Sequence, residues 1–129
     1  MANPNIVSVA TILGGNAGWN LGTTLTTELL NVTAEYVLKI NRIVCTNVHA
    51  TDAANLSLYV GGMGSGTTGV TVAGGDATVY LAKVISVPAN SSLVVLDTPI
   101  YMMETDVLKG GSSASSTLDL FVSYETLID

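Results

Sequence analysis

Three carboxylates in the last third of the chain are the side chains best suited to hold a cation. Asp97, Glu104 and Asp106 follow one another closely, and a hard cation such as Ca²⁺ prefers oxygen ligands of this kind. The residue spacing of a calcium-binding loop is absent from this stretch. We therefore interpret the three residues as parts of solvated turns and expect neither a metal site nor a cofactor.

The single histidine, His49, has an ordinary pKa close to neutrality, which makes it the first candidate for a catalytic base. Neither a nucleophile nor an orienting carboxylate stands in a catalytic motif with it. We interpret it as a solvated turn residue at the end of a strand. Because no acid and base pair occurs at usable spacing, the sequence predicts a protein without catalytic residues, and a hydrolase is the least favoured class.

One glycine-rich segment imitates a nucleotide-binding motif. Gly64, Gly66 and Gly69 have the spacing of a dinucleotide fingerprint, but residues 70–72 are typical of a strand where the fingerprint requires a helix. We interpret the match as spurious. The whole segment 61–75 contains seven glycines in fifteen residues, and we predict a surface loop or an arm that contacts a neighbouring subunit.

Four apolar residues are the candidate assembly contacts: Trp19, Met63, Val70 and Val72. Trp19 stands beside a glycine-rich turn, where a tryptophan is more often a core plug or an interface anchor than a platform for a sugar. The other three are the main apolar side chains that segment 61–75 offers. Its glycines have much backbone entropy to lose, so we predict that the segment is mobile in the free protein and ordered in an assembly.

The composition also points to assembly. Charged residues make up 11% of the chain, well below the usual figure of about 25%, and the mean hydropathy is +0.52. Such a chain must either cover its surface with small uncharged residues or bury that surface against other subunits. The net charge of −6, with four scattered cations, argues against a nucleic-acid partner.

Cysteine usage and the N-terminus restrict the compartment. Cys45 is the only cysteine, which excludes an intrachain disulfide, and its neighbours Ile43 and Val44 favour a buried, unreactive thiol. We expect a reducing environment during folding. No secretory leader pattern and no apolar run long enough to cross a bilayer is present, so we expect a soluble chain without a membrane partner.

The stretch from Ala82 to Leu108 organises the rest of the chain. Its β-branched runs are separated by turn signals at Pro88 and Pro99, which predict a strand, a turn, a strand, a corner and a third short strand, followed by an acidic tip. Elsewhere we predict strands at 6–13, 21–31, 36–48, 56–60 and 118–124, with loops at 14–18 and 109–116.

Two of these strands carry more specific expectations. Strand 36–48 is expected to place Val44 on its apolar face and Asn47 on its polar face, and strand 56–60 is expected to return as the second strand of a hairpin. Regular short strands separated by turns predict an antiparallel β-sandwich of jelly-roll or Greek-key type with roughly eight strands. We expect one domain, residues 1–129, with a short N-terminal arm at 1–5.

Several segments of the sequence resemble a known protein module. SVPANSSLVVLDTPIYMMETDVLKG, followed by LDLFVSYETL, resembles a recurrent part of small virion proteins of tailed bacteriophages, and MANPNIVSVATI and VLKINRIVCTN are similar to its front half in phages of marine bacteria and cyanobacteria. The tip Glu104-Thr105-Asp106 departs from the pattern, which would have a central glycine, and segment 61–75 is longer than usual.

The resemblance implies a structural protein of the virion that decorates or cements the capsid or forms part of the tail or neck. It also implies assembly in the cytoplasm of the bacterial host, with the major capsid protein or another virion protein as a partner. We expect a symmetric homo-oligomer, a homotrimer first of all. The alternative is a carbohydrate- or receptor-binding module of a phage fibre that uses Trp19 and tyrosines as stacking platforms.

Overall fold

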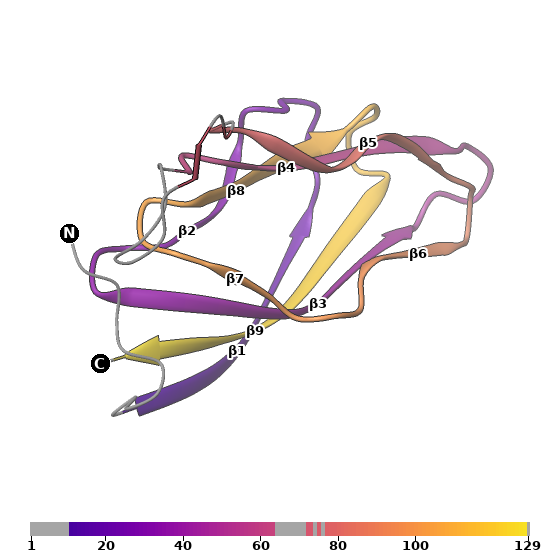
Figure 1. Ribbon diagram of the computed structural model, residues 1–129. Helices are drawn as coiled ribbons and strands as arrows, with labels where there is room; N and C mark the ends of the chain where they lie inside the picture. Colours follow the sequence, from indigo (N-terminus) through magenta and orange to yellow (C-terminus); the bar gives the residue numbers. More distant parts are fainter. Residues whose placement is uncertain (1–10, 64–71, 74, 76, 129) are drawn as a thin grey trace.

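The computed structural model describes residues 11–63, 72–73, 75 and 77–128, and strands are the only regular elements in these residues. The described part holds no helix of the length and apolar character needed to cross a membrane. Figure 1 shows the strands in chain order. Their bounds are β1 Thr11–Asn20, β2 Glu28–Asn31, β3 Tyr36–Asn47, β4 Ala54–Gly61, β5 Val79–Val87, β6 Ser92–Leu96, β7 Ile100–Met102, β8 Val107–Ser112 and β9 Leu118–Ile128.

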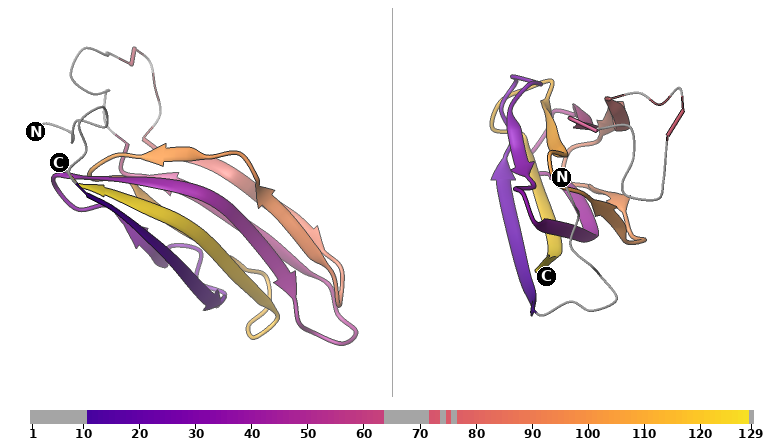
Figure 2. Two further views of the ribbon diagram at one scale, coloured as in Figure 1. Left: turned by 90° about the horizontal axis from the view of Figure 1, so that it is seen from below. Right: turned by 60° about the vertical axis from the view of Figure 1, so that its left-hand side comes forward.

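The strands form two antiparallel sheets that pack face to face (Figures 1 and 2). Sheet A has the order β1-β9-β3-β6, with β7 also paired to β3, and sheet B has the order β2-β8-β4-β5. Because β6 and β7 pair with successive parts of β3, they act as one edge strand interrupted at Asp97–Pro99. With those two strands counted as one, the order is that of an eight-stranded jelly roll. The predicted antiparallel β-sandwich is confirmed.

The core lies between the inner faces of the two sheets. The alternation predicted for strand 118–124 is confirmed, since Leu118, Leu120 and Val122 of β9 are buried while Asp119 and Phe121 are exposed. Strand β4 is buried along most of its length: Asn55 and Tyr59 are half-buried, while Ser57 lies buried with its apolar neighbours. Full burial of one such aliphatic side chain stabilises the fold by about 1.5–3 kcal/mol. The buried cluster includes Ile40, Ile43, Cys45, Leu56, Leu58, Val87, Met102 and Leu108.

A bulge in β3 overturns the predicted faces of that strand. The pairing with β9 shifts between Ile40 and Arg42, and one extra residue moves every later side chain to the opposite face. Val44 therefore lies on the outer face of sheet A. Asn47, predicted on the polar face, is buried instead.

Buried Asn47 joins three segments through its amide group. Its Nδ2 donates to the carbonyl oxygens of Asp52 at 2.9 Å and Val87 at 2.8 Å, and its Oδ1 accepts from the backbone N–H of His49 at 2.8 Å. These bonds hold the end of β3, the following turn and the end of β5 together. A buried polar group is tolerated at this place because its hydrogen bonds are made.

The N-terminal part of the sandwich differs from the expectation. The predicted loop at 14–18 is strand, because β1 runs through Gly14, Gly15 and Gly18 and pairs with β9 without a register shift. Residues 6–10 of the predicted first strand and the predicted arm at 1–5 lie outside the described residues. Of the predicted strand 21–31 only Glu28–Asn31 forms, and residues 21–27 are irregular, with a turn at 25–26.

Two further expectations fail in sheet B. The segment 56–60 lies in β4, but β4 pairs with β5 and β8 rather than returning as a hairpin beside β3. The predicted loop 109–116 begins with strand, because β8 continues to Ser112. Gly110 fits there since a Cβ atom would collide with the backbone of Ser57 on the paired strand. The local sequence shows only the two glycines, and the close approach of the two strands depends on pairing with a distant segment.

Candidate binding surfaces

The three carboxylates do not converge on a cation site. Glu104, expected in a solvated turn, is 8% exposed, and its Oε2 accepts a hydrogen bond from the backbone N–H of Glu35 at 3.0 Å. Asp106 Oδ2 accepts from the N–H of Met103 at 2.9 Å, whereas Asp97 is exposed at the corner before β7. In the described ranges, no three His, Cys, Asp or Glu side chains are grouped as metal ligands would be.

His49 belongs to the turn between β3 and β4. Its Nδ1 accepts hydrogen bonds from the backbone N–H groups of Thr51 at 3.2 Å and Asp52 at 2.9 Å, and its Nε2 lies 3.8 Å from Asp52 Oδ2. One ring nitrogen is thus occupied by the turn itself. This arrangement agrees with a turn residue whose ring orders the backbone.

Cys45 is fully buried in the core, as predicted. Burial, with a smaller contribution from the negative charge of Asp119, raises the pKa of its thiol to about 11. Because the thiolate is the reactive form of cysteine, the group is protonated and inert near neutral pH.

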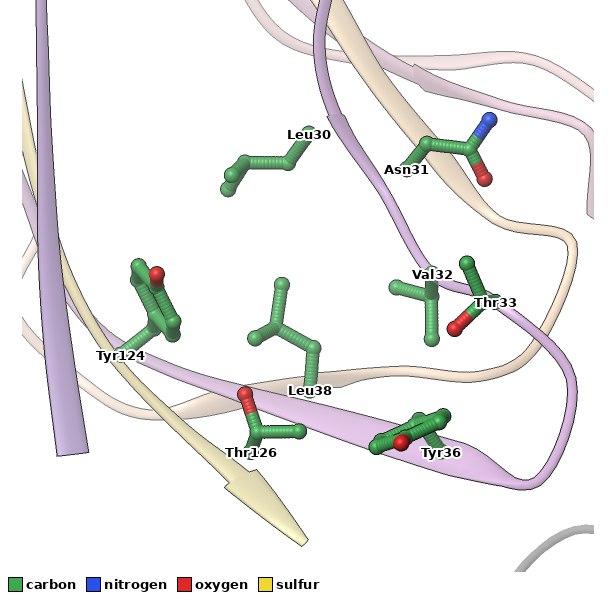
Figure 3. Close-up of a pocket in the computed structure, with 8 residues that line it drawn as sticks. All are labelled: Leu30, Asn31, Val32, Thr33, Tyr36, Leu38, Tyr124 and Thr126. Carbon is green, nitrogen blue, oxygen red and sulfur yellow. The ribbon is translucent and has the colours of Figure 1, made fainter. Parts of the chain in front are cut away.

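A cavity of about 250 Å³ opens between the sheets beside β2 (Figure 3). The side chains of Leu30 and Leu38 point into it from opposite walls, and the ring of Tyr124 closes one side. Its polar lining consists of hydroxyl and amide groups, without an acid, an imidazole or a thiol. Its volume is below the usual range for ligand pockets. The remaining lining residues are Asn31, Val32, Thr33, Tyr36 and Thr126.

An apolar row crosses the outer face of sheet A. Phe121 of β9 pairs with Val44 of β3, which pairs with Val94 of β6. Phe121 and Val94 are each 45% exposed. We call these three residues the outer apolar row. At its β1 end Phe121 pairs with Gly18, which has no side chain to cover the ring.

A polar row runs directly beside the outer apolar row. Asn20 Nδ2 donates to Asp119 Oδ1 at 2.8 Å, and the hydroxyl groups of Thr46 and Ser92 share a hydrogen bond of 2.9 Å. Between the rows lies an open hollow lined by residues that include Phe121, Val44 and Thr46. An apolar strip beside a hydrogen-bonded polar strip is the composition expected of a protein-binding surface rather than of a reaction site.

The outer face of sheet B carries an aromatic pair. Tyr59 and Tyr80 pair across β4 and β5, with their ring centroids 5.1 Å apart and the rings tilted by 47°. The ammonium group of Lys83 lies 5.1 Å from the centroid of Tyr80. The Tyr80 ring is therefore already engaged by two neighbours.

Three of the four predicted assembly residues, Trp19, Met63 and Val72, lie in the described part of the chain. Trp19 lies in β1 and is half-buried against the core. Met63, which follows β4, is also half-buried against the core, and its backbone N–H donates to the carbonyl oxygen of Ala77 at 3.2 Å. Val72 is exposed. Val70 lies outside the described residues, as does most of segment 61–75, so the predicted order of that segment in an assembly stays a prediction.

Sequence reasoning missed the outer apolar row. One signal was present, because the alternation of strand 118–124 places Phe121 on the polar face with Asp119 and Ser123. An aromatic residue among exposed polar positions indicates a contact surface. The positions of Val44 and Val94 depend on the bulge and on the pairing of distant strands, and no local pattern reveals them.

Comparisons of this chain with protein-family models, with curated proteins and with solved structures find no match.

Proposed function

We propose that this chain is a non-enzymatic structural protein of a virion, which decorates or cements the capsid or forms part of the tail or neck. The observation that carries the proposal is the outer apolar row, in which Phe121 and Val94 are exposed and Val44 is half-buried, on a chain with 11% charged residues. A flat strip of this kind suits another protein surface. The resemblance of segments 86–110 and 118–127 to phage virion proteins is the reason for proposing a phage particle as the assembly.

The jelly roll is compatible with the proposal but also with the alternative, since capsid proteins and lectins both use this fold. The alternative, a carbohydrate- or receptor-binding module of a phage fibre, draws on the exposed ring of Tyr80. Because Tyr59 and Lys83 already contact that ring, it offers less free surface to a sugar than an isolated aromatic residue would. We therefore place the virion role first.

The test is an attachment assay on particles made without this protein. Purified wild-type protein is added, and the copies bound per particle are measured after sedimentation. We expect many copies to bind in a symmetric arrangement visible by cryo-electron microscopy. Phe121→Asp should reduce the bound copies at least tenfold, because it places a charge at the centre of the apolar strip.

Val79→Asp is the matched control, since Val79 is a similarly exposed aliphatic residue of sheet B. It should attach as the wild type does. Absence of the protein from native particles would contradict the virion role, and equal attachment of both variants would exclude the outer apolar row as the contact. Binding to a glycan array that is lost in Tyr80→Ala would favour the alternative.

A further inference from the structure

The free edge of β1 differs from the other free edges of the sandwich. An edge strand exposes unpaired backbone N–H and C=O groups that can pair with another chain, and proteins usually protect such edges with charges, prolines, bulges or short strands. Within the described residues, the four edges are β1 and β6–β7 of sheet A and β2 and β5 of sheet B. They can be compared one by one.

Three of the edges carry such protection. Strand β2 has only four residues and begins with Glu28. The β6–β7 edge is broken by the corner at Asp97–Pro99. Strand β5 carries Lys83, its pairing with β4 shifts twice, and Val84 has a φ of +52°, a conformation that is strained for a β-branched residue.

Strand β1 carries none of these protective features. Its ten residues, TILGGNAGWN, include no charge and no proline, and it pairs with β9 in an unbroken register. At the usual rise the strand is about 33 Å long. Its side chains leave apolar surface uncovered, since Ile12 is 60% and Leu13 52% exposed.

We infer that β1 is a pairing edge that binds β1 of a second copy of this chain, antiparallel, to join two A sheets into one continuous sheet. The inference deepens the proposed assembly role, because it names the partner. An uncharged edge suits this partner, since two chains of net charge −6 repel least where neither carries a charge on the paired strand.

The geometry of a two-fold pair restricts the register. Directly opposite residues of antiparallel strands share a face of the sheet. Two-fold symmetry then places one residue opposite its own copy, and nearly complete overlap of the ten-residue strand requires that residue to be Gly15 or Asn16. The register centred on Asn16 brings exposed Leu13 opposite Trp19 of the second copy, on the face of sheet A that points to the core.

The Asn16 register is favoured by side-chain chemistry as well. An amide carries both a donor and an acceptor, so Asn16 can bond to its own copy across the axis. Gly14 and Gly18 then stand opposite each other and leave that contact unobstructed. The nine opposed residues, 12–20, would exchange about eight to ten backbone hydrogen bonds. The edge pattern thus favours a dimer as the first assembly unit rather than the expected trimer.

The first test is the mass of the purified protein. Light scattering over a range of concentrations should give a species of twice 13.2 kDa. Gly14→Lys should be a folded monomer, because a Cβ atom at Gly14 meets open space in the single chain while the charge protects the edge. Ser86→Lys on edge strand β5 is the matched control and should remain a dimer.

The second test is disulfide cross-linking. Asn16→Cys introduces an exposed thiol on the axis, while native Cys45 is buried and does not compete. We expect a covalent dimer on mild oxidation, and none from Ser92→Cys on the opposite edge of sheet A. A monomeric wild type, a trimer, or an assembly that survives Gly14→Lys would overturn the inference. These measurements use the isolated protein, so they fail or succeed independently of whether it is found in virions.

Discussion

The ring of Tyr124 lies against Gly15 on the neighbouring strand, where a Cβ atom would come within 2.7 Å of its Cζ atom. The glycine is therefore required by its neighbour and not by a turn. This contact sets the position of the aromatic wall of the inter-sheet cavity.

The first prediction tests this contact. Gly15→Ala should lower the free energy of unfolding by about 1 kcal/mol, the low end for overpacking, because the displaced atoms are at the movable end of the tyrosine and a cavity adjoins them. Gly14→Ala meets open space and should be neutral or stabilising by about 0.5 kcal/mol. Urea unfolding at one protein concentration measures both.

A double-mutant cycle identifies the partner of Gly15. In a Tyr124→Leu background, Gly15→Ala should cost less than it does in the wild type, because the ring is gone. An unchanged cost would mean that the loss arises from the backbone of β1 and not from Tyr124.

The second prediction concerns the two faces of β9. Leu120→Asp and Val122→Asp should each abolish folding, because both side chains are buried and an unpaired charge there costs several kcal/mol, comparable with the total stability of a small domain. Phe121→Asp, between them on the outer face, should fold with a nearly unchanged melting temperature. Circular dichroism separates the three variants, and a folded Leu120→Asp protein would refute the assignment of inner and outer faces.

The parts of this fold that the sequence predicts are those with local causes. Pro88 and Pro99 interrupt strands by their own chemistry, and the strands and turns between Ala82 and Leu108 are found where those signals place them. Alternation likewise identifies the inner face of β9, because it has a period of two and no bulge interrupts it along the residues 118–124.

The parts that the sequence does not predict depend on partners distant in the chain. The glycines of β1 lack any strand propensity of their own, and the pairing with β9 imposes the strand. The bulge at Asn41 leaves no local sign, yet it decides that Val44 joins Phe121 outside and that Asn47 is buried. The candidate surface on sheet A was missed for the same reason, since β6 supplies part of it.

The third prediction follows from the buried amide. Asn47→Ala should cost about 2–4 kcal/mol, because it leaves the carbonyl oxygen of Val87 and the N–H of His49 without their partner. Asn47→Asp should be damaging too, since a carboxylate cannot donate to the two carbonyls. His49→Ala is the control: its ring bonds lie in the turn outside the core, so the loss should be smaller. Equal losses for Asn47→Ala and His49→Ala would show that the turn, and not the buried amide, joins the segments.

The fourth prediction is a dependence of stability on pH at Asp106. Partial burial raises the pKa of this carboxyl group above its ordinary value, and the hydrogen bond from the backbone of Met103 opposes only part of the rise. The folded state then holds the proton more tightly than the unfolded state does. The stabilising contribution is fully present below the ordinary pKa of about 3.8, and it is lost as the pH rises through the raised value.

Asp106→Asn isolates this contribution. The amide does not titrate, and its oxygen can still accept from the Met103 N–H, so the pH dependence of the difference between the two proteins comes from the wild-type carboxyl group. The stability of the variant relative to the wild type should therefore be higher near pH 7 than near pH 4. Denaturant unfolding of both proteins at the two pH values measures the difference between their free energies of unfolding. The contributions of the other carboxylates are the same in both proteins and cancel in that difference. A difference that stays constant, or that grows as the pH falls, would mean that the folded protein does not raise the pKa of Asp106.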